Sequence, residues 1–366
     1  MLECDALIVG GGPAGSTCAR ALRQAGWNVV VMDRATFPRD KVCAGWVTPH
    51  VLRAIELDPA EYRRAGLTMQ EITGFRTSVE GRPPVETQYG EPISYAIRRC
   101  EFDTFLLRRS GAQVLEGTAL TSLHRDGDDW VANGSVRAPI VIGAGGHFCP
   151  VARHLRNGEG VPEPVVAKEA EFILDEDSPV APQVPELFFC RDLEGYAWCV
   201  RKGTYVNVGI GRRVNERFGA HVEAFKEFLE RSGKAPGASR AKWKGHAYLA
   251  CGTGSRRLVG EGMLLIGDAA GLAYPESGEG IRPAVESGLL AARTVIAAGR
   301  RAPADALRGY EDELRRRYPA SIPSRGAWSR GVTAVGRLLL RSRLFTRHVV
   351  IDRWFLRIGS MRSAIS

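Results

Sequence analysis

The chain has 366 residues and a formal net charge of +9 at pH 7. Residues 301–366 contain 14 Arg, no Lys and five acidic residues, so this end alone carries 14 − 5 = +9 and residues 1–300 sum to zero. A protein that binds nucleic acid over its whole fold would spread its positive charge, so this distribution argues against that class. The 44% hydrophobic and 25% charged residues are typical of globular domains and exclude general disorder.

The eight cysteines are scattered singly, without a C-x-x-C pair, and none follows Cys251. We therefore expect reduced thiols and a cytoplasmic location. A strand that begins by Asp5 leaves no room for a secretion signal, and no apolar run reaches the roughly 18 residues needed to span a bilayer. The spacing of His147, Cys149 and His154 fits no known ligand pattern, so we expect no metal site.

The first elements form a predicted βαβ unit. A short apolar strand runs directly into a glycine-rich turn with the pattern G-x-G-x-x-G, and a helix and a second apolar strand follow; these segments are residues 6–9, 10–15, 16–25 and 28–32. The turn lies between a buried strand and a helix, which is the context in which this pattern binds the phosphates of a dinucleotide.

Each residue of this motif has a mechanical role. Gly10 makes the turn, Gly12 lets the backbone approach a pyrophosphate, and Gly15 allows the helix to pack closely on the strand. Asp33 ends the second strand and is placed to bind the adenosine ribose. An acid at that position argues against a 2′-phosphate, so the motif predicts FAD or NAD rather than NADP.

A second glycine-acid motif favours the flavin. A buried strand at residues 263–266 is followed by Gly267-Asp268-Ala269-Ala270-Gly271, and a glycine-rich loop at residues 274–280 opens an Ala-rich helix at residues 281–298. An acid at a strand end beside a helix N-terminus suits a polyhydroxyl chain and a developing anion. FAD has both, in its ribityl chain and its reduced ring, whereas NAD has neither.

These motifs together resemble the geranylgeranyl reductase family, which belongs to the FAD proteins with the aromatic-hydroxylase fold. The resemblance covers most of the chain and rests on Val9–Gly15, Asp33-Arg34, the stretch from Phe37 to Pro49, Arg99 ahead of Phe102-Asp103, Gly267–Gly271 and Gly278–Ile281. The string Pro-Glu-Ser-Gly-Glu-Gly-Ile at residues 275–281 is more similar to the reductases than to the hydroxylases.

The resemblance implies flavin contacts by position. The residues that it places at FAD are Gly10, Gly12, Pro13, Ala14, Gly15, Asp33, Arg34, Cys43, Ala44, Trp46, Arg99, Leu120, Asp268, Pro275, Gly278, Gly280 and Ile281. Cys43, Ala44 and Trp46 would lie near the isoalloxazine, Arg99 near the phosphates or the ribityl chain, and Asp268 at the ribityl chain. Leu120, in a strand expected after Gly111-Ala112, would meet the adenine through its backbone.

The expected substrate residues are aromatic. Gly195-Tyr196-Ala197-Trp198 resembles the substrate-domain motif of the family, although its Phe-Pro is replaced by Val200-Arg201. Alternation on a strand would put Tyr196 and Trp198 on one face, where they form either a wall for an apolar chain, together with Trp46, or ordinary cross-strand packing. Cys43 and Tyr196 are the candidate catalytic proton donors, and a buried, inert thiol remains the alternative for Cys43.

The expected fold class is α/β (α+β), with a Rossmann-like FAD-binding domain, an inserted antiparallel β-sheet substrate domain and a C-terminal helical region. The predicted domains are residues 1–70, 95–160 and 245–300 for FAD, 71–94 and 161–244 for substrate, and 301–366 for the basic helical region. On a helical projection, the arginines of residues 343–357 share one arc, which suggests either contact with an anionic membrane or a helix docked on the protein.

The leading functional prediction is an FAD-dependent oxidoreductase that reduces carbon-carbon double bonds of a prenyl-like or other apolar substrate. The alternative is a flavin-dependent monooxygenase or halogenase for an aromatic or polyketide-type substrate; Gly145, where hydroxylases of this fold carry Asp, disfavours it. A third possibility is a flavin-binding electron carrier. The expected partners are an apolar small molecule and an external electron donor, either NAD(P)H or a reductase or ferredoxin. The expected location is the cytoplasm, with peripheral contact at the inner face of the membrane.

Overall fold

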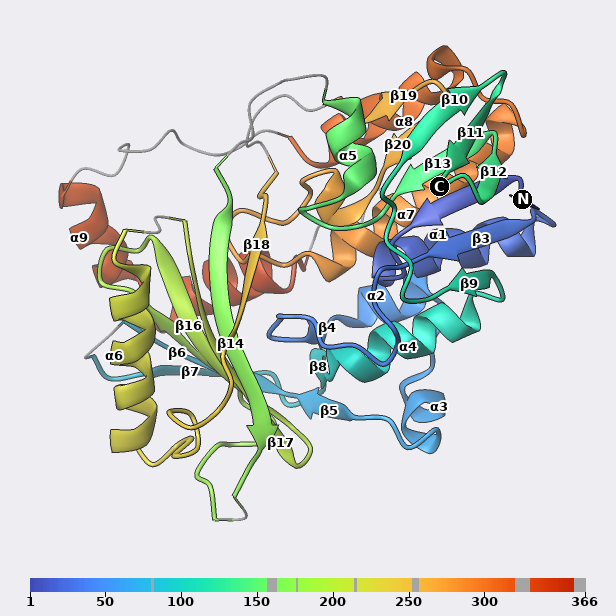
Figure 1. Ribbon diagram of the computed structural model, residues 1–366. Coiled ribbons are helices and arrows are strands. Elements are labelled where there is room, and N and C mark those ends of the chain that lie inside the picture. The colour runs from blue at the N-terminus through green and yellow to red at the C-terminus, as the bar shows by residue number, and fades with distance from the viewer. Residues whose placement is uncertain are drawn as a thin grey trace. The chain divides into compact units, whose positions relative to one another are not determined.

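The computed structural model describes residues 1–79, 82–156, 163–175, 177–213, 216–251, 257–319 and 330–358 (Figure 1). The chain forms two compact units, each assembled from three stretches of sequence. The first unit contains residues 1–40, 100–163 and 248–322, and the second contains residues 41–99, 164–247 and 323–366. The mixed α/β architecture expected from the sequence is confirmed.

A six-stranded sheet forms the centre of the first unit, in the order β19-β20-β13-β2-β3-β9. The first two strands pair antiparallel and the rest pair parallel. The strands are β2 (Ala6–Val9), β3 (Val29–Met32), β9 (Gln113–Leu115), β13 (Ile140–Gly143), β19 (Val259–Gly260) and β20 (Met263–Leu265). The central strands are buried along their whole length, which explains their continuous apolar sequences.

Helices and a small second sheet complete this unit. The helices are α1 (Pro13–Gln24), α4 (Arg99–Arg109, which begins at the boundary of the second unit), α5 (Pro150–Leu155), η1 (Gly267–Ala269), α7 (Ile281–Ala298) and α8 (Ala304–Arg317). The small sheet consists of β1 (Leu2–Glu3), β12 (Val136–Ala138), β11 (Asp129–Ala132) and β10 (Leu123–Asp126). Helix α1 begins at Pro13, earlier than the predicted residue 16, because proline fits the first turn of a helix.

Two sheets form the core of the second unit. A seven-stranded sheet has the order β18-β14-β17-β16-β15-β6-β7, and a three-stranded sheet has the order β4-β8-β5. The strands are β4 (Trp46–Val47), β5 (Met69–Ile72), β6 (Gly74–Val79), β7 (Val85–Gln88), β8 (Ser94–Ile97), β14 (Val165–Ile173), β15 (Glu186–Phe189), β16 (Gly195–Lys202), β17 (Tyr205–Arg212) and β18 (Lys244–Tyr248). Strands β14 to β17 pair antiparallel as expected, while β6 joins β15 in parallel.

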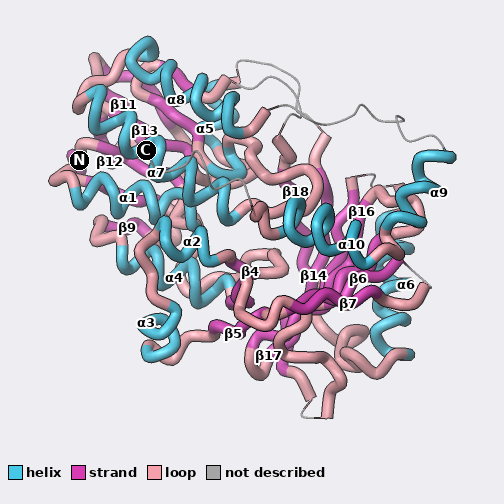
Figure 2. Tube along the Cα trace, turned by 180° about the vertical axis from the view of Figure 1, so that it is seen from behind, coloured by secondary structure: helices cyan, strands magenta, loops and turns pink. Residues whose placement is uncertain are grey.

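The large sheet of the second unit is covered on both faces, as Figures 1 and 2 show. Alternate residues of β16 explain this arrangement: Ala197 and Cys199 pack with helix α6 (Phe218–Arg231), whereas Trp198 and Val200 pack with π-helix η2 (Thr346–Phe355). The remaining helices of this unit are α2 (Pro49–Ala54), α3 (Pro59–Arg64), α9 (Arg330–Leu339) and α10 (Arg343–Phe345).

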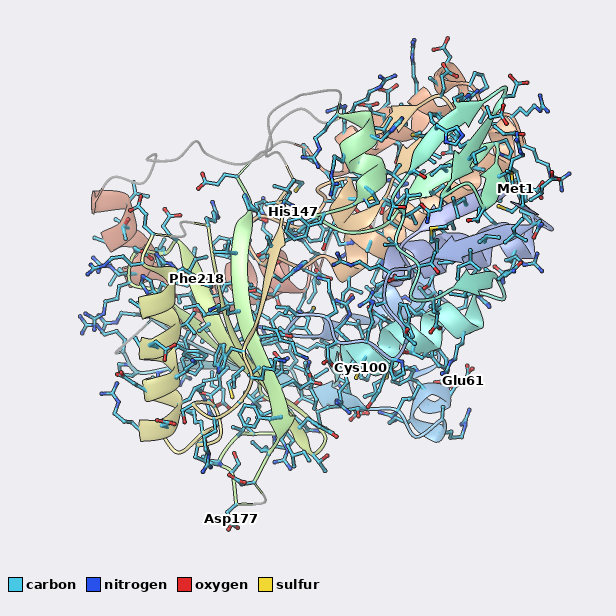
Figure 3. All side chains as sticks on the ribbon, in the orientation of Figure 1. Met1, Glu61, Cys100, His147, Asp177 and Phe218 are labelled. Carbon is cyan, nitrogen blue, oxygen red and sulfur yellow. The ribbon has the colours of Figure 1, made fainter. Side chains whose placement is uncertain are left out.

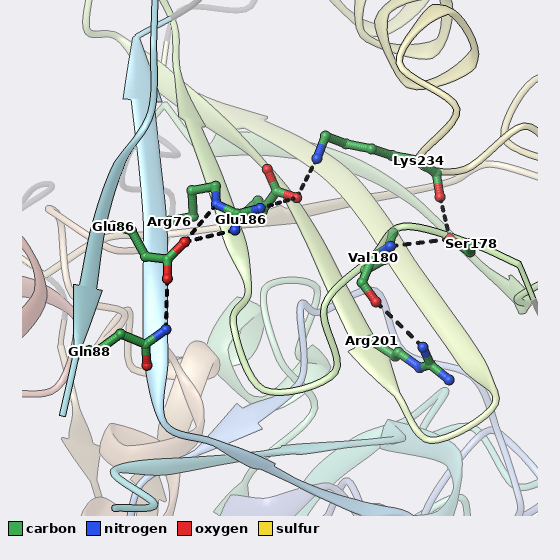
Figure 4. Close-up of polar contacts among 8 residues, drawn as sticks. All are labelled: Arg76, Glu86, Gln88, Ser178, Val180, Glu186, Arg201 and Lys234. Atoms are coloured by element: carbon green, nitrogen blue, oxygen red, sulfur yellow. Dashed lines mark hydrogen bonds and ion pairs between the residues drawn. The ribbon is translucent and has the colours of Figure 1, made fainter. Parts of the chain in front are cut away.

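A chain of polar contacts crosses the seven-stranded sheet near the start of β15 (Figure 4). The buried carboxylate of Glu186 accepts a hydrogen bond of 2.6 Å from Lys234 and lies 3.6 Å from the guanidinium of Arg76. The loop after β14, whose tip carries Asp177 in Figure 3, is tied to this region because Ser178 donates to the backbone oxygen of Lys234. Buried charges in this sheet therefore have partners, as stability requires.

The observed units divide the chain differently from the predicted domains. Residues 41–70 belong to the second unit, because β4 and β5 both pair with β8 rather than with the large parallel sheet. Residues 301–366 do not form a region of their own: α8 belongs to the first unit and α9 to η2 belong to the second. Residues 320–329 and 359–366 lie outside the described residues.

The C-terminal helix also differs from the projection used to predict it. Residues 346–355 form a π-helix, with i→i+5 hydrogen bonds such as that from Leu356 N to Ile351 O, so an α-helical projection misplaces its side chains. Val350, Ile351 and Phe355 are fully buried in the second unit. Within the described part of the chain, no helix combines the length and apolar character needed to cross a bilayer.

The crossing of α1 and α7 gives a prediction about stability. A Cβ at Gly288 of α7 would lie 2.5 Å from the backbone oxygen of Ala14 in α1, so Gly288→Ala should destabilise the protein by about 1–3 kcal/mol. The matched control is Gly309→Ala in α8, where a Cβ meets nothing within 4 Å. This substitution should raise the free energy of unfolding by up to about 1 kcal/mol, because alanine has a higher helix propensity than glycine. Urea unfolding of both variants measures the difference, and equal effects would contradict the tight crossing.

Candidate functional site

The glycine-rich turn after β2 leaves no space for side chains where two parallel strands end. Gly10 has φ +116°, and a Cβ there would lie 2.4 Å from the backbone oxygen of Ala144, just beyond β13. A Cβ at Gly15 would lie 1.9 Å from the oxygen of Gly10. These contacts place the N-terminus of α1 at the carboxyl edge of the sheet, where ligands bind in folds of this kind.

Gly12 is the N-cap of α1, and no side chain caps the helix there. The first backbone N–H groups of a helix lack intrahelical partners and lie at the positive end of its dipole. A Cβ at Gly12 would meet only the guanidinium of Arg39, at 3.4 Å. The helix end can therefore be approached closely by an anionic group such as a pyrophosphate.

Arg39 is a residue of this site that the sequence analysis did not single out. Its Nη1 lies 3.1 Å from the fully buried carboxylate of Asp103 in α4, which fixes the guanidinium beside the glycine turn. Arginine binds phosphate oxygens well because its planar donors match their geometry. Arg39 lies in the stretch from Phe37 to Pro49 that resembles the reductase family, and this position could have marked it as a candidate. Its orienting partner, Asp103, lies 64 residues further along the chain.

Asp33 lies at the end of β3 and is 9% exposed. Its Oδ2 accepts a 2.7 Å hydrogen bond from Gly11 N, and its Oδ1 accepts a 2.9 Å bond from Ala35 N. Each carboxylate oxygen can accept a further bond. The acid thus holds the glycine turn in shape and keeps acceptor capacity for a ribose hydroxyl.

Asp268 lies in η1, directly after β20, beside the start of the second long helix. A Cβ at Gly280, the N-cap of α7, would lie 3.0 Å from Asp268 Oδ1, so the carboxylate packs tightly against the start of the helix. Gly267 has φ +59°, donates to Ser287 Oγ at 2.9 Å, and would meet Ala14 if it carried a Cβ. The first turn of α1 therefore packs against both η1 and α7.

The loop before α7 is a closed turn that contains two more predicted residues. Gly278 N donates to Tyr274 O at 2.8 Å, and Tyr274 N donates to Glu279 O at 3.0 Å. Gly278 has φ +67°, and a Cβ there would lie 2.3 Å from the Tyr248 hydroxyl. Pro275 lies inside this turn, and Ile281 begins the helix.

Leu120 is not in a strand, contrary to the sequence prediction. It lies in the loop between β9, which ends at Leu115, and β10, which begins at Leu123. Thr118 N donates to Asp33 O at 2.8 Å, so this loop is held against the end of β3. Gly117 and the threonines at residues 118 and 121 favour a loop over the expected strand.

The first unit has the features that FAD requires of a site. Two helices of at least 12 residues begin near each other without side-chain caps, an arginine lies beside one of them, and Asp33 and Asp268 follow two strands of the same sheet. An anionic pyrophosphate fits the helix end and the arginine, and hydroxyl groups fit the two carboxylates. Glycine at position 12 leaves space beside the helix end, where a Cβ would meet only Arg39.

Arg34 follows Asp33 in the first unit, whereas Cys43, Ala44 and Arg99 lie in the second unit. Cys43 and Ala44 are half-buried in the loop before β4, and Arg99 is buried at the start of α4. Cys43 N donates a 2.7 Å hydrogen bond to Oε2 of Glu169 in β14. Gly45, with φ +68°, packs so closely that a Cβ would lie 2.6 Å from Lys202 Nζ.

One face of β16 changes from aromatic to charged along its length. Tyr196, Trp198, Val200 and Lys202 alternate onto the same face, and the rings of Tyr196 and Trp198 lie 6.0 Å apart. Phe355 of η2 packs on Tyr196 at 5.4 Å and on Trp46 at 5.8 Å. The three predicted substrate residues therefore share one apolar cluster, and the C-terminal helix of this unit covers them.

The charged end of this face contains residues that the sequence analysis missed. Lys202 is fully buried and pairs with Glu171 at 2.8 Å; Arg98 binds the other oxygen of Glu171 at 2.9 Å. Trp198 Nε1 donates to Asn207 Oδ1 at 2.7 Å, which links the aromatic end to the charged end. Glu169 and Glu171 alternate onto one face of β14. Two acids on the same face of a strand were the feature of the sequence that could have indicated this charged group.

Burial raises the pKa of Glu169 to about 7, although Lys202 and the N–H of Cys43 favour its charged form. Burial acts to raise the pKa of Glu171 as well. There, however, the charges and hydrogen bonds of Lys202 and Arg98 outweigh burial and hold the pKa below its usual range. The two neighbouring carboxyls therefore differ in charge near neutral pH. Such a separation is common at functional sites.

Relatives of this chain include proteins named as reductases. The chain is 28% identical over 342 residues to digeranylgeranylglycerophospholipid reductase 3 of Methanosphaera stadtmanae, and the aligned region covers 88% of this chain and 83% of the relative. It is 27% identical to menaquinone reductase of Mycobacterium tuberculosis, over 92% of this chain and 84% of the relative. The resemblance to the geranylgeranyl reductases is confirmed by these matches.

Solved structures share the fold. A geranylgeranyl bacteriochlorophyll reductase-like protein from Thermoplasma acidophilum matches with a TM-score of 0.73 at 21% identity, covering 100% of this chain and 94% of that one. The flavin-dependent halogenase CmlS matches with a TM-score of 0.68 at 20% identity, covering 94% of this chain and 71% of that one. At these identities the likeness is one of fold.

The profile of a family described as FAD binding domain matches residues 3–322, a range that includes the glycine turn, Asp33, Asp268 and α7. The chain therefore belongs to the FAD binding domain family and is an FAD-dependent oxidoreductase.

Proposed function

We propose that this flavoenzyme reduces carbon-carbon double bonds in a polyprenyl-like substrate. The observation that carries the proposal is the β16 face, where the Tyr196–Trp198 aromatic cluster continues into the charged group that holds the Cys43 loop. Both reductase relatives are named for molecules with long isoprenoid chains, and aromatic side chains bind such chains through apolar contact.

The reaction adds one hydride and one proton across the double bond. Reduced FAD supplies the hydride when bound, and an external donor restores its electrons. The residues of the first unit bind and orient the dinucleotide, while Trp46, Tyr196 and Trp198 exclude water and align the apolar chain. The Cys43 thiol or the Tyr196 hydroxyl delivers the proton.

Anaerobic turnover tests this proposal. The bound flavin is reduced with one equivalent of dithionite, and a detergent-dispersed digeranylgeranyl glycerolipid is added without oxygen. We expect flavin reoxidation together with product that is heavier by two hydrogens per double bond. If the flavin reoxidises only when oxygen is admitted, and the product contains oxygen or halogen, the monooxygenase or halogenase alternative replaces the proposal.

Asp268 should determine how firmly FAD is held. Asp268→Ala removes a charged acceptor expected to bind the ribityl hydroxyls, which is worth about 1.5–3 kcal/mol, or on the order of 10- to 100-fold in affinity. Flavin absorbance per protein after gel filtration measures the loss. The matched control is the exposed Asp128→Ala in the same unit, which should keep full occupancy; equal occupancy in both variants would remove Asp268 from the site.

Glu169 should make turnover depend on pH. Delivering a proton leaves negative charge on the donor, and an ionised Glu169 beside Cys43 opposes that charge. Because the pKa of Glu169 lies near 7, the rate should fall as pH rises through that value. Lys202, Glu171 and, through Glu171, Arg98 are the other charged groups that face this site.

Glu169→Gln keeps an oxygen that accepts the Cys43 N–H but cannot ionise. We therefore expect its kcat profile to lose the limb near pH 7, whereas Glu169→Ala should lower kcat at every pH because the loop loses its acceptor. Rapid-reaction traces of flavin reoxidation from pH 5.5 to 8.5 measure both. An unchanged limb in Glu169→Gln would show that another group titrates.

We also infer that the enzyme works at the periphery of a membrane, because its proposed substrate is a lipid. The electron donor is either NAD(P)H or a reductase or ferredoxin, and comparing these donors anaerobically distinguishes them. For the basic segment 343–357 the sequence left two alternatives, contact with an anionic membrane or a helix docked on the protein. The structure buries Val350, Ile351 and Phe355 of this segment inside its own unit. A surface that meets the membrane must therefore use residues other than this buried side of η2.

A further inference from the structure

Helix α9 exposes its apolar side chains to solvent. At 100° per residue, Val332, Val335, Leu338 and Leu339 share an arc of about 120°. Their exposed fractions are 42%, 57%, 64% and 40%. A helix that covers a protein core shows the reverse arrangement, with its apolar arc buried.

The orientation of α9 is set by a second pair of residues. A Cβ at Gly336 would lie 2.7 Å from Leu193 Cδ1, so this glycine lets the helix approach the loop between β15 and β16. Leu340, one turn later, is 7% exposed and belongs to the apolar cluster of the second unit. The helix is therefore anchored by its Gly336–Leu340 side. On the same projection Leu338 lies opposite this anchor, Val335 lies at least 100° from it, and Val332 and Leu339 flank it.

The exposed apolar residues are concentrated here. Among the residues that the structure describes, ten large apolar side chains are exposed, and five of them lie between Val332 and Leu344. Leu344 is the most exposed, at 72%. Isolated exposed apolar residues are normal, whereas a cluster of this kind indicates an interaction surface.

The charged residues of the segment that carries this cluster all have the same sign. Residues 330–347 contain five Arg and no acidic residue. Arg337, Arg341, Arg343 and Arg347 are all exposed. Apolar side chains flanked by arginine match the two layers of an anionic bilayer, namely acyl chains below and negative headgroups above.

We propose that α9 and the turn that follows it, up to Leu344, form a docking surface for an anionic lipid bilayer. The apolar arc enters the boundary between headgroups and acyl chains, and the arginines bind lipid phosphates. This inference rests on the proposed function only in that a lipid substrate gives the enzyme a reason to meet a membrane. It moves the main contact from the segment 343–357 to α9 and keeps only the exposed start of that segment, since η2 packs inward.

Vesicle flotation tests the surface with full-length, FAD-loaded protein. Wild type should bind vesicles of phosphatidylglycerol and phosphatidylcholine and should bind weakly to phosphatidylcholine alone. Leu338→Glu should lower the partition coefficient at least ten-fold, and Arg341→Gln should lower it about five-fold at low salt and less at high salt. The matched control is Ile173→Glu, which places the same charge on a 69% exposed residue of the same unit and should leave binding unchanged.

Other outcomes overturn the proposal. If Ile173→Glu and Leu338→Glu weaken binding equally, the effect is one of net charge. If wild type ignores vesicles and sediments as a dimer that Leu338→Glu converts to a monomer, the surface binds a second copy of the chain. Circular dichroism and flavin content must be unchanged in each variant, which excludes unfolding.

Turnover separates this inference from the proposed reductase activity. Leu338→Glu should reduce a detergent-dispersed substrate at the wild-type rate and a vesicle-embedded substrate at least five-fold more slowly. Equal rates with both substrate forms would reject the docking surface and leave the reductase proposal standing. Vesicle binding without any reduction would reject the reductase proposal and leave the docking surface standing.

Discussion

The close crossing of α1 and α7 is the constraint on which the first unit depends. A Cβ at Gly288 would lie 2.5 Å from the backbone oxygen of Ala14, and one at Gly15 would lie 1.9 Å from that of Gly10, so a larger residue at either position would force the backbone to shift. Gly267, whose φ is +59°, also lies close to Ala14. Two long helices therefore begin near each other at the edge of one sheet. The crossing brings the positive ends of both helices to the edge of the sheet at which Asp33 and Asp268 lie. The chemistry of the FAD site therefore depends on glycines whose role is to let these helices pack closely.

The second unit organises its chemistry through strand alternation. Every second residue of β16 faces α6, and the others form a row from Tyr196 to Lys202. Gly209, opposite Trp198 in β17, leaves room for the indole, because a Cβ there would lie 2.3 Å from its ring. A buried lysine costs much free energy unless it is paired, and Glu171 meets that need for Lys202 while Glu169 remains near its point of titration.

The features that could be predicted from the sequence are formed by residues that lie close together in the chain. The glycine turn, Asp33 and the Asp268 loop are contiguous motifs in which geometry follows from a few neighbouring residues. Arg39 with Asp103, and Cys43 with Glu169, join residues 64 and 126 positions apart, and only the folded chain brings them together. The prediction for residues 343–357 assumed an α-helical period, and the π-helix at η2 turned Val350 inward instead of toward the basic side.

Most of the net charge of +9 on residues 301–366 comes from a shorter segment, residues 330–358. In α8, arginines pair with acids one turn away, as in Arg308 with Asp305, Arg315 with Glu311, and Arg316 and Arg317 with Glu313. Residues 330–358 contain seven Arg and one Asp, a net charge of +6, and Asp352 accepts a hydrogen bond from Tyr89. At physiological ionic strength a charge acts over about 8 Å, so neutralised arginines on α8 contribute little at a distance. The field that attracts an anionic surface therefore arises mainly from the segment that also exposes Val335 and Leu338.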